Sequence, residues 1–418
     1  MALLLLVLSL PKFTIAGSPV ARDFIIYQGE QDQVTPAVAY NPILMNYLVV
    51  WSNDRPGNDD IYARRLSAHG KHLRPWFSIA AGTGFERRNP DVAFNDALDE
   101  FLVVWEEEPH AGYITIRGIR VSKYGELIPP VIEISSGPAL KNCQKPSVAY
   151  ASTSDKYLVV WQNMVLGGIH STIEVQVISS SGVPDGGNLS LSATSGSSIS
   201  DSNPDVAYNR SHNEYLVVWE RVNQNIMPVD ADLYGRLVSG NGAPQGPAAE
   251  SISSEKDDQL NPTVAAIPTV PGEGKYFVAW ESLYAPGNMN IYGKRLTHDL
   301  SSDSFIWMLS TSLLDDSNPS VAADEHSDQF LIAWSQPWGS GSNSQISVRY
   351  FPQETNTQGD SFQIGGYQTG MYSSQPATVA GTSGDFLVAF SDLTLGLPDK
   401  DIFGQLLGNR QYIPLTIR

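Results

Sequence analysis

One unit is repeated seven times along this chain. A proline shortly before a Val-Ala pair recurs, and each copy is followed by an aromatic residue, three apolar residues and a tryptophan, as in residues 47–51. In the seventh copy Phe390 replaces the tryptophan, and successive anchors are 54 to 61 residues apart. A fixed period of this length is the mark of a repeat architecture. The units start near Pro36, Pro90, Pro146, Pro204, Pro262, Pro319 and Pro376.

Each unit reads as four short strands. In the fourth unit the first three are 206–208, 215–219 and 232–236, and the fourth strand is a weaker run before the next proline, as in 361–364. Proline is tolerated at the first residue of a strand, and Gly, Asn and Ser clusters separate the segments as turns.

The second strand of every unit is apolar on both faces, as in Tyr-Leu-Val-Val-Trp, so both faces must be covered. A four-stranded sheet packed between two identical sheets satisfies this, and a radial arrangement of such sheets is a β-propeller. The sequence therefore predicts an all-β fold, a single seven-bladed β-propeller of four-stranded antiparallel blades over residues 22–418. Immunoglobulin-like modules need about 100 residues each, and the coils of a β-helix are much shorter.

Closing the ring leaves two alternatives. Residues 22–27 and residues 412–417 both resemble a fourth strand for the seventh unit. Either the N-terminal strand closes the seventh blade, or one of the two becomes an additional edge strand.

The units resemble a repeat of exported bacterial surface proteins, written roughly N-P-x-V-A-Y, Y-L-V-V-W and D-I-Y-G-x-R. Residues 203–208, 215–219 and 232–236 carry the resemblance best, and Lys145 and Gln375 depart from it by replacing the asparagine before proline. The resemblance implies a secreted or cell-surface propeller without an assigned activity, and it supplies no catalytic residue.

The N-terminus and the net charge bound the location and the partners. Residues 1–16 combine an apolar run with small residues, as a secretory signal peptide does, and no later stretch could insert the mature chain into a membrane. A net charge of −18 argues against nucleic acid, because phosphate binding depends on Lys and Arg. We expect a secreted or cell-surface monomer whose lone Cys143 is a buried or unreactive thiol, not a catalytic one.

No motif for catalysis, a metal ion or a cofactor is found. The chain lacks the H-E-x-x-H, G-x-S-x-G, Walker and calcium-loop patterns, and its seven histidines show no metal-ligand spacing. We therefore predict no catalytic residues, no metal site and no cofactor.

Strand parity locates a candidate binding surface. Loops after the second and fourth strands of each unit emerge on one face, which we call the loop face, and the shorter turns emerge on the opposite turn face. Variable loops on a rigid repeated frame are common binding sites. Exposed aromatic rings suit stacking on sugars or anchoring a protein. The candidate ligand-binding residues are Trp338, Tyr284, Tyr113, Tyr367 and Tyr372.

The predicted function is a binding or scaffold module for a glycan or a protein partner. The alternative is a carbohydrate-active hydrolase or lyase with carboxylates near the central axis. Among the carboxylates on the loop face, Glu106, Glu220 and Glu281 are interpreted as solvated loop charges.

Overall fold

The computed structural model describes residues 23–408, apart from 56, 111–112, 136–140, 166–169, 193–197, 226–228, 268–273, 286–287, 302–304, 340–342, 353–357, 366–371, 382–383 and 394–398. Within these residues the regular secondary structure consists of 28 β-strands, and no helix long and apolar enough to cross a membrane occurs. The predicted signal peptide at 1–16 and the expected strand at 412–417 lie outside the described residues.

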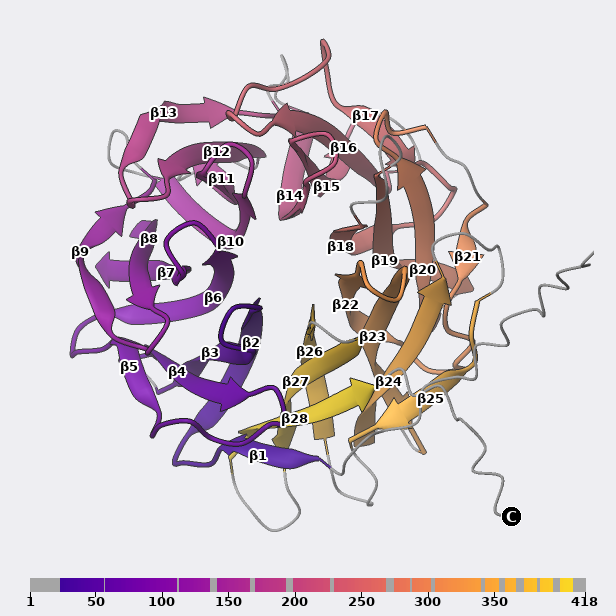
Figure 1. Ribbon diagram of the computed structural model, residues 1–418. Helices are drawn as coiled ribbons and strands as arrows, with labels where there is room; N and C mark the ends of the chain where they lie inside the picture. Colours follow the sequence, from indigo (N-terminus) through magenta and orange to yellow (C-terminus); the bar gives the residue numbers. More distant parts are fainter. Residues whose placement is uncertain are drawn as a thin grey trace, which may run out of the picture.

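The strands form a closed ring of sheets around a central axis (Figure 1). The innermost strand of each sheet contacts the innermost strand of the next, and β26 contacts β2. These inner strands contain the repeated prolines. They are β2 (Asp32–Asn41), β6 (Glu86–Asn95), β10 (Lys141–Ala151), β14 (Ile199–Asn209), β18 (Gln259–Ile267), β22 (Ser317–Asp324) and β26 (Tyr372–Ala380).

From each inner strand the chain meanders outward through antiparallel neighbours. The second strands carry the apolar repeat: β3 (Asn46–Asp54), β7 (Glu100–His110), β11 (Lys156–Val165), β15 (Glu214–Asn223), β19 (Lys275–Ala285), β23 (Gln329–Trp338) and β27 (Asp385–Leu393). The third strands are β4 (Asp60–Ser67), β8 (Tyr113–Ser122), β12 (Ser171–Ser179), β16 (Ala231–Ser239), β20 (Asn288–Thr297), β24 (Asn343–Pro352) and β28 (Asp401–Gly408). The outer strands are β5 (Phe77–Ala80), β9 (Leu127–Glu133), β13 (Pro184–Ser190), β17 (Glu250–Ser253), β21 (Trp307–Met308), β25 (Ser361–Ile364) and β1 (Phe24–Tyr27).

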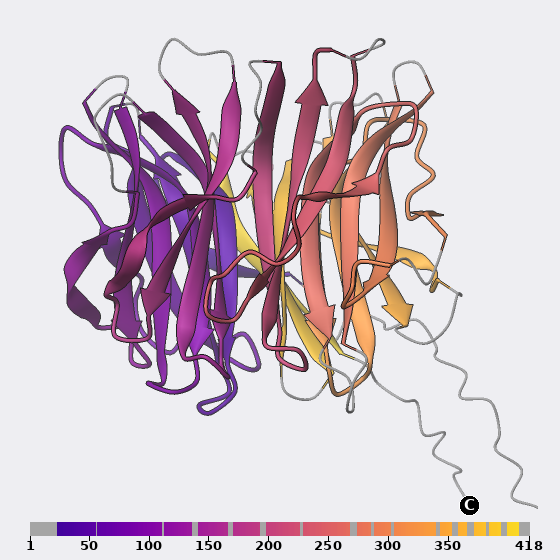
Figure 2. The ribbon, with the colours of Figure 1, turned by 90° about the horizontal axis from the view of Figure 1, so that it is seen from above.

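Three of the sheets are four-stranded and two are eight-stranded. Each eight-stranded sheet joins two four-stranded antiparallel groups through one parallel pair, Asn142 with Ile114 or Ser344 with Tyr372. The predicted β-propeller fold is thus confirmed as an all-β ring of four-stranded antiparallel groups of strands. Seen from the side, the strands run between two opposite faces, which carry the loops and the turns (Figure 2).

The N-terminal strand closes the ring. β1 pairs antiparallel with β28, so a strand from the start of the chain supplies the outer strand of the last sheet. The backbone N–H of Gly29 also donates to Asp401 Oδ1 at 3.1 Å. The N-terminal strand thus takes the outer position that the first alternative gives it, while residues 412–417 lie outside the described residues.

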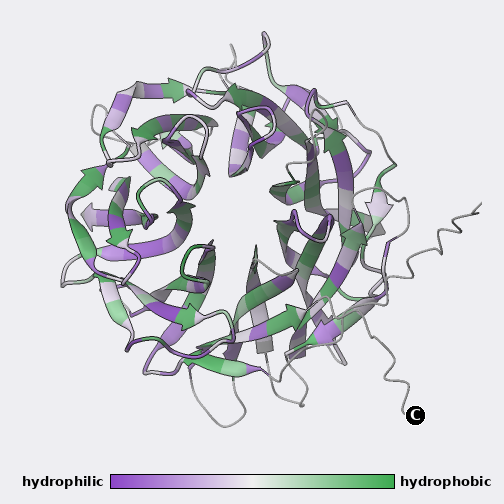
Figure 3. Cartoon of the chain, in the orientation of Figure 1, coloured by the Kyte–Doolittle hydropathy of each residue, from purple (hydrophilic) through white to green (hydrophobic). Residues whose placement is uncertain are grey.

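The apolar core lies between neighbouring sheets, because the second strands are covered on both faces. Six repeated tryptophans have at most 1% of their surface exposed, and the cluster around Trp161 contains Leu102 and Val104 from the preceding unit. Apolar residues accordingly mark successive sheets around the ring (Figure 3). The prediction that both faces of the second strand are covered is confirmed.

A second repeated position is buried and polar. Three residues before the repeated proline, a side chain of the inner strand faces a side chain of the second strand. The pairs are Arg87 with Glu107 in the second unit and Asp201 with Arg221 in the fourth. Arg87 Nε donates to Glu107 at 2.9 Å, and Arg221 Nε donates to Asp201 at 2.7 Å. Cys143 occupies this position in the third unit and is 3% exposed, which confirms the prediction of a buried thiol.

Candidate functional site

A polar cavity of about 490 Å³ occupies the loop-face half of the central channel. Each unit contributes the middle of its inner strand, where the repeated proline lies at a shift in the strand register, so the sequence repeat itself builds the wall. The expectation that this proline is the first residue of its strand is wrong, because β14 begins five residues before Pro204. The lining segments are 35–38, 89–91, 145–148, 203–206, 261–264, 318–321 and 375–378.

The residue before each of these prolines has a left-handed backbone, with φ between 48° and 55°. The pairing register with the second strand shifts at the same point in every unit, as between Ser202 and Asp205. Asparagine adopts this conformation more readily than other non-glycine residues, which explains the Asn-Pro motif. Lys145 and Gln375 adopt it as well, so these two departures from the motif leave the backbone unchanged.

Glutamates on the second strands link neighbouring units beside this cavity. Glu106 Oε1 accepts from Asn89 Nδ2 at 2.8 Å within its unit, and from the backbone N–H of Lys145 in the next unit at 2.7 Å. Glu220 repeats the arrangement with Asn203 and with the N–H of Asn261. Between the sixth and seventh units a serine takes the place of the glutamate. Ser335 Oγ accepts a hydrogen bond from the backbone N–H of Gln375 at 3.2 Å.

The interpretation of Glu106, Glu220 and Glu281 as solvated loop charges is therefore wrong. They are 3%, 5% and 6% exposed, and Glu281 accepts from the backbone N–H of Asn318 at 2.7 Å. Burial raises the pKa of all three carboxyls, while these hydrogen bonds act in the opposite direction. The sequence position directly after the repeated tryptophan could have indicated this, because the residue is still inside the strand.

Two aspartates that the sequence analysis did not single out lie in the cavity wall. Asp91 and Asp205 follow the proline in the second and fourth units, where other units have Ala, Ser or Thr. Asp91 accepts from the backbone N–H of Val92 and of Val148, both at 2.8 Å. Asp205 accepts from Ser147 Oγ at 2.8 Å and from Thr263 Oγ1 at 3.0 Å. The two carboxylates thus join successive inner strands around the channel.

Burial in the channel wall raises the pKa of both aspartates, to about 7 for Asp91. A carboxyl group that titrates near neutral pH can hold or release a proton, which is a property of many functional sites. Here both oxygens of Asp91 already accept backbone hydrogen bonds. These hydrogen bonds hold the Asp91 carboxyl group in place. We therefore interpret it as a fixed polar group of the cavity wall and not as an acid or base that transfers a proton.

The raised pKa of Asp91 predicts that stability depends on pH. An unfolded aspartate loses its proton near pH 4, whereas folded Asp91 keeps it up to about pH 7. Unfolding between these values releases a proton, so the free energy of unfolding should fall as the pH rises through this window. In urea titrations at pH 5 and pH 8, Asp91→Asn should gain stability relative to the parent at the higher pH. Asp96→Asn, in an exposed turn of the same unit, should show no such change, and parallel profiles for Asp91→Asn and the parent would contradict the prediction.

The turn-face half of the channel holds a second cavity, also of about 490 Å³. It shares Val38, Val148 and Thr378 with the first and is lined further along by alanines and by aromatic rings such as Tyr40 and Phe94. Arg210 and Glu325, from turns of two different units, form an ion pair at 2.6 Å in its wall. The channel is therefore polar toward the loop face and more apolar toward the turn face.

Acidic residues between the first two units are paired with arginines. Asp60 lies 3.3 Å from Arg55 and 3.5 Å from Arg87, and Asp59 lies 3.4 Å from Arg88. These carboxylates are neutralised by cations of the chain, so the arrangement is an ion-pair network.

Only two of the five predicted aromatic side chains, those of Tyr113 and Trp338, lie within the described part of the structure. Tyr113, at the start of β8, is 37% exposed, and Trp338, at the end of β23, is half-buried. Neither lines the central cavity, and they belong to different units. Tyr284 and Tyr372 lie in β19 and β26, but their side chains are outside the described part of the structure, as is all of Tyr367. The candidates therefore do not form one described site.

No family model and no curated protein matches this sequence. Solved structures with a similar fold include a protein of unknown function from Dyadobacter fermentans, with a TM-score of 0.56 and 12% identity over 94% of this chain and 99% of that one. An alpha-L-arabinanase from Penicillium chrysogenum complexed with arabinobiose has a TM-score of 0.51 and 12% identity over 94% and 99% of the chains. A polysaccharide lyase, an ulvan lyase bound to -[GlcA(1-4)Rha3S]-, has a TM-score of 0.55 and 8% identity over 95% and 96%. At these identities the similarity is one of fold.

Proposed function

We propose that this chain is an exported seven-bladed β-propeller that binds a glycan at its loop face, at the mouth of the central channel. The blade count rests on the seven sequence repeats and on the single parallel pairs that divide each eight-stranded sheet into two groups. Export rests on the apolar run at 1–16.

The observation that carries the binding proposal is the polar cavity of about 490 Å³ at the loop face. Its wall presents amide, hydroxyl and carboxylate groups from the seven repeats, and such groups hydrogen-bond to sugar hydroxyls. A cavity of this size with convergent polar groups is a common form of ligand site. Two proteins of similar fold were solved with glycans: the arabinanase with arabinobiose, which is neutral, and the lyase with -[GlcA(1-4)Rha3S]-, which carries uronate and sulfate groups. Both support a glycan ligand, and only the arabinanase supports a neutral one.

The charge of the chain narrows the class to neutral glycans. With a net charge of −18, the protein repels polyanions at low salt. We therefore expect binding to neutral oligosaccharides and weaker binding to uronate-rich or sulfated ones.

The enzyme alternative has one observation in its favour, the pKa of about 7 at Asp91 near the axis. A glycosidase or lyase needs a group of this kind that is free to transfer a proton. The hydrogen bonds that Asp91 and Asp205 accept from neighbouring strands hold their oxygens in structural links, so binding is the better supported function.

A glycan array probed with the purified chain tests the proposal. Hits should be competed by free oligosaccharide and weakened at least about fivefold by Lys145→Asn, which removes an exposed side chain at the cavity mouth and keeps a residue that tolerates the left-handed backbone. Tyr113→Ala and Trp338→Ala test the loop aromatics in the same assay. Asn241→Ala, in an exposed turn of the opposite face, is the control.

Three results would count against the proposal. The first is a glycan array without hits, and the second is a loss of binding in Asn241→Ala alone. The third is cleavage of a bound polysaccharide by the parent that Asp91→Asn abolishes. The last result would identify the enzyme alternative.

A further inference from the structure

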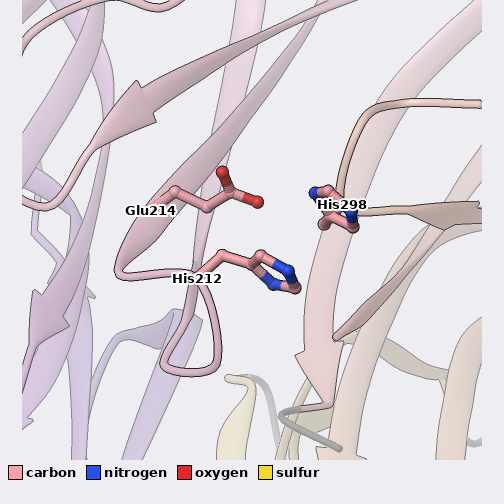
Figure 4. Close-up of side chains that lie close together, drawn as sticks. All are labelled: His212, Glu214 and His298. Carbon is pink, nitrogen blue, oxygen red and sulfur yellow. The ribbon is translucent and has the colours of Figure 1, made fainter. Parts of the chain in front are cut away.

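Two histidines and a glutamate from different units meet on the turn face (Figure 4). His212 lies in the turn between β14 and β15, and Glu214 is the first residue of β15. His298 follows the last residue of β20, in the next unit along the ring. The two histidines are far apart in sequence, which is why no metal-binding spacing is visible there.

The ligand atoms of these three side chains all lie within 4.8 Å of one another. The two imidazole rings stack, with centroids 3.9 Å apart and planes at 9°. A metal ion lies near the plane of each imidazole that binds it, so one ring must turn about its Cβ–Cγ bond to share an ion with the other. Both histidines are half-buried residues in turns.

The surroundings hold the third ligand in place. Glu214 is 5% exposed, and its Oε1 accepts a hydrogen bond from the hydroxyl of Tyr276 at 3.2 Å. Hydrogen bonds of this kind orient the ligands of metal sites. Next to His298, the carboxylate of Asp299 accepts from Thr297 Oγ1 at 2.6 Å and from the N–H of Ser301 at 3.0 Å, which fixes the turn.

We propose that His212, Glu214 and His298 form a Zn²⁺ site that joins the fourth and fifth units on the turn face. Two imidazole nitrogens and one carboxylate oxygen are a common zinc ligand set, and three protein ligands leave the fourth tetrahedral position to water. Ca²⁺ and Mg²⁺ prefer six or more oxygen ligands, which this donor set does not provide. The site lies on the face opposite the proposed glycan site and is independent of it.

Titration of the tag-free, chelator-treated chain with Zn²⁺ in a calorimeter tests this proposal. The parent should bind one equivalent, and its melting temperature should rise with the Zn²⁺ concentration, because the ion binds the folded state. Loss of an outer-shell partner alone weakens metal sites about 10- to 100-fold, so His298→Ala, which removes a ligand, should weaken binding at least tenfold. His69→Ala changes an exposed histidine in the corresponding turn of the first unit and should bind like the parent.

X-ray absorption of the zinc-loaded parent gives a second measurement that needs no variant. It should show nitrogen and oxygen ligands at about 2.0–2.1 Å with the outer scattering of two imidazoles. The proposal is overturned if the parent shows no saturable one-to-one binding, if His298→Ala binds as tightly as the parent, or if the spectrum contains no imidazole scattering.

Discussion

Replacing Trp161 with alanine should lower the free energy of unfolding by about 3–5 kcal/mol. The side chain is fully buried and packs against Leu102 and Val104 of the neighbouring unit, so its removal opens a cavity between two sheets. The substitution removes packing from both units, because the Trp161 side chain lies at the interface between them.

Denaturant unfolding monitored by far-ultraviolet circular dichroism measures this loss. Trp76→Ala is the matched control, since Trp76 is 42% exposed on the outside of the ring and its loss leaves no closed cavity. We expect a clearly smaller effect there. Equal unfolding free energies for Trp161→Ala and the parent would mean that the interface between the units is not what holds the ring together.

Removing the carboxylate of Asp201 should also cost about 3 kcal/mol, because it leaves a largely buried arginine, whose side chain is 13% exposed, without its ion-pair partner. Asp201 is fully buried, and it accepts two hydrogen bonds from Arg221, at 2.7 and 3.0 Å. The guanidinium group of Arg221 also lies over the ring of Tyr234, at 4.3 Å from its centroid, and this contact holds it at the ion pair.

The repeat itself supplies a rescue for this variant. At the same register in the second unit, Arg87 and Glu107 form the pair with the charges exchanged. The double variant Asp201→Arg and Arg221→Glu should therefore be more stable than Asp201→Ala and than Arg221→Glu alone. Chemical denaturation of the three variants gives the comparison, and a double variant no more stable than the singles would show that the two positions do not form an interchangeable pair.

The repeats predicted the architecture well because the same apolar pattern occurs in every unit. An apolar pattern on both faces of residues 47–51 and its copies requires a sheet on either side, and the structure shows all six tryptophans buried. The end that closes the ring could not be predicted, since residues 22–27 and 412–417 have similar patterns. That choice depends on the geometry of the whole ring.

The candidate site was harder to predict, because its groups come together only across units. The sequence interpretation places Glu106 in a loop, although it is the first residue after the tryptophan and still belongs to the strand. Asp91 is inconspicuous in sequence because its burial comes from the inner strands on either side. His212 and His298 show the same limit, since no local pattern relates two turns in different units.

The closure of the ring by its first strand has a consequence for the order of folding. The contact between Gly29 and Asp401 spans 372 residues, compared with 41 for the link between Glu220 and Asn261. In a flexible-chain estimate the longer closure costs only about 2 kcal/mol more entropy, so it is affordable at equilibrium but comes late in time. Until β1 pairs with it, β28 is an open strand edge that contains apolar residues such as Ile402, which is buried in the closed ring. An open edge accepts the same strand from a second copy, so during refolding the tethered strand competes with strand exchange between molecules, and protein concentration sets the outcome.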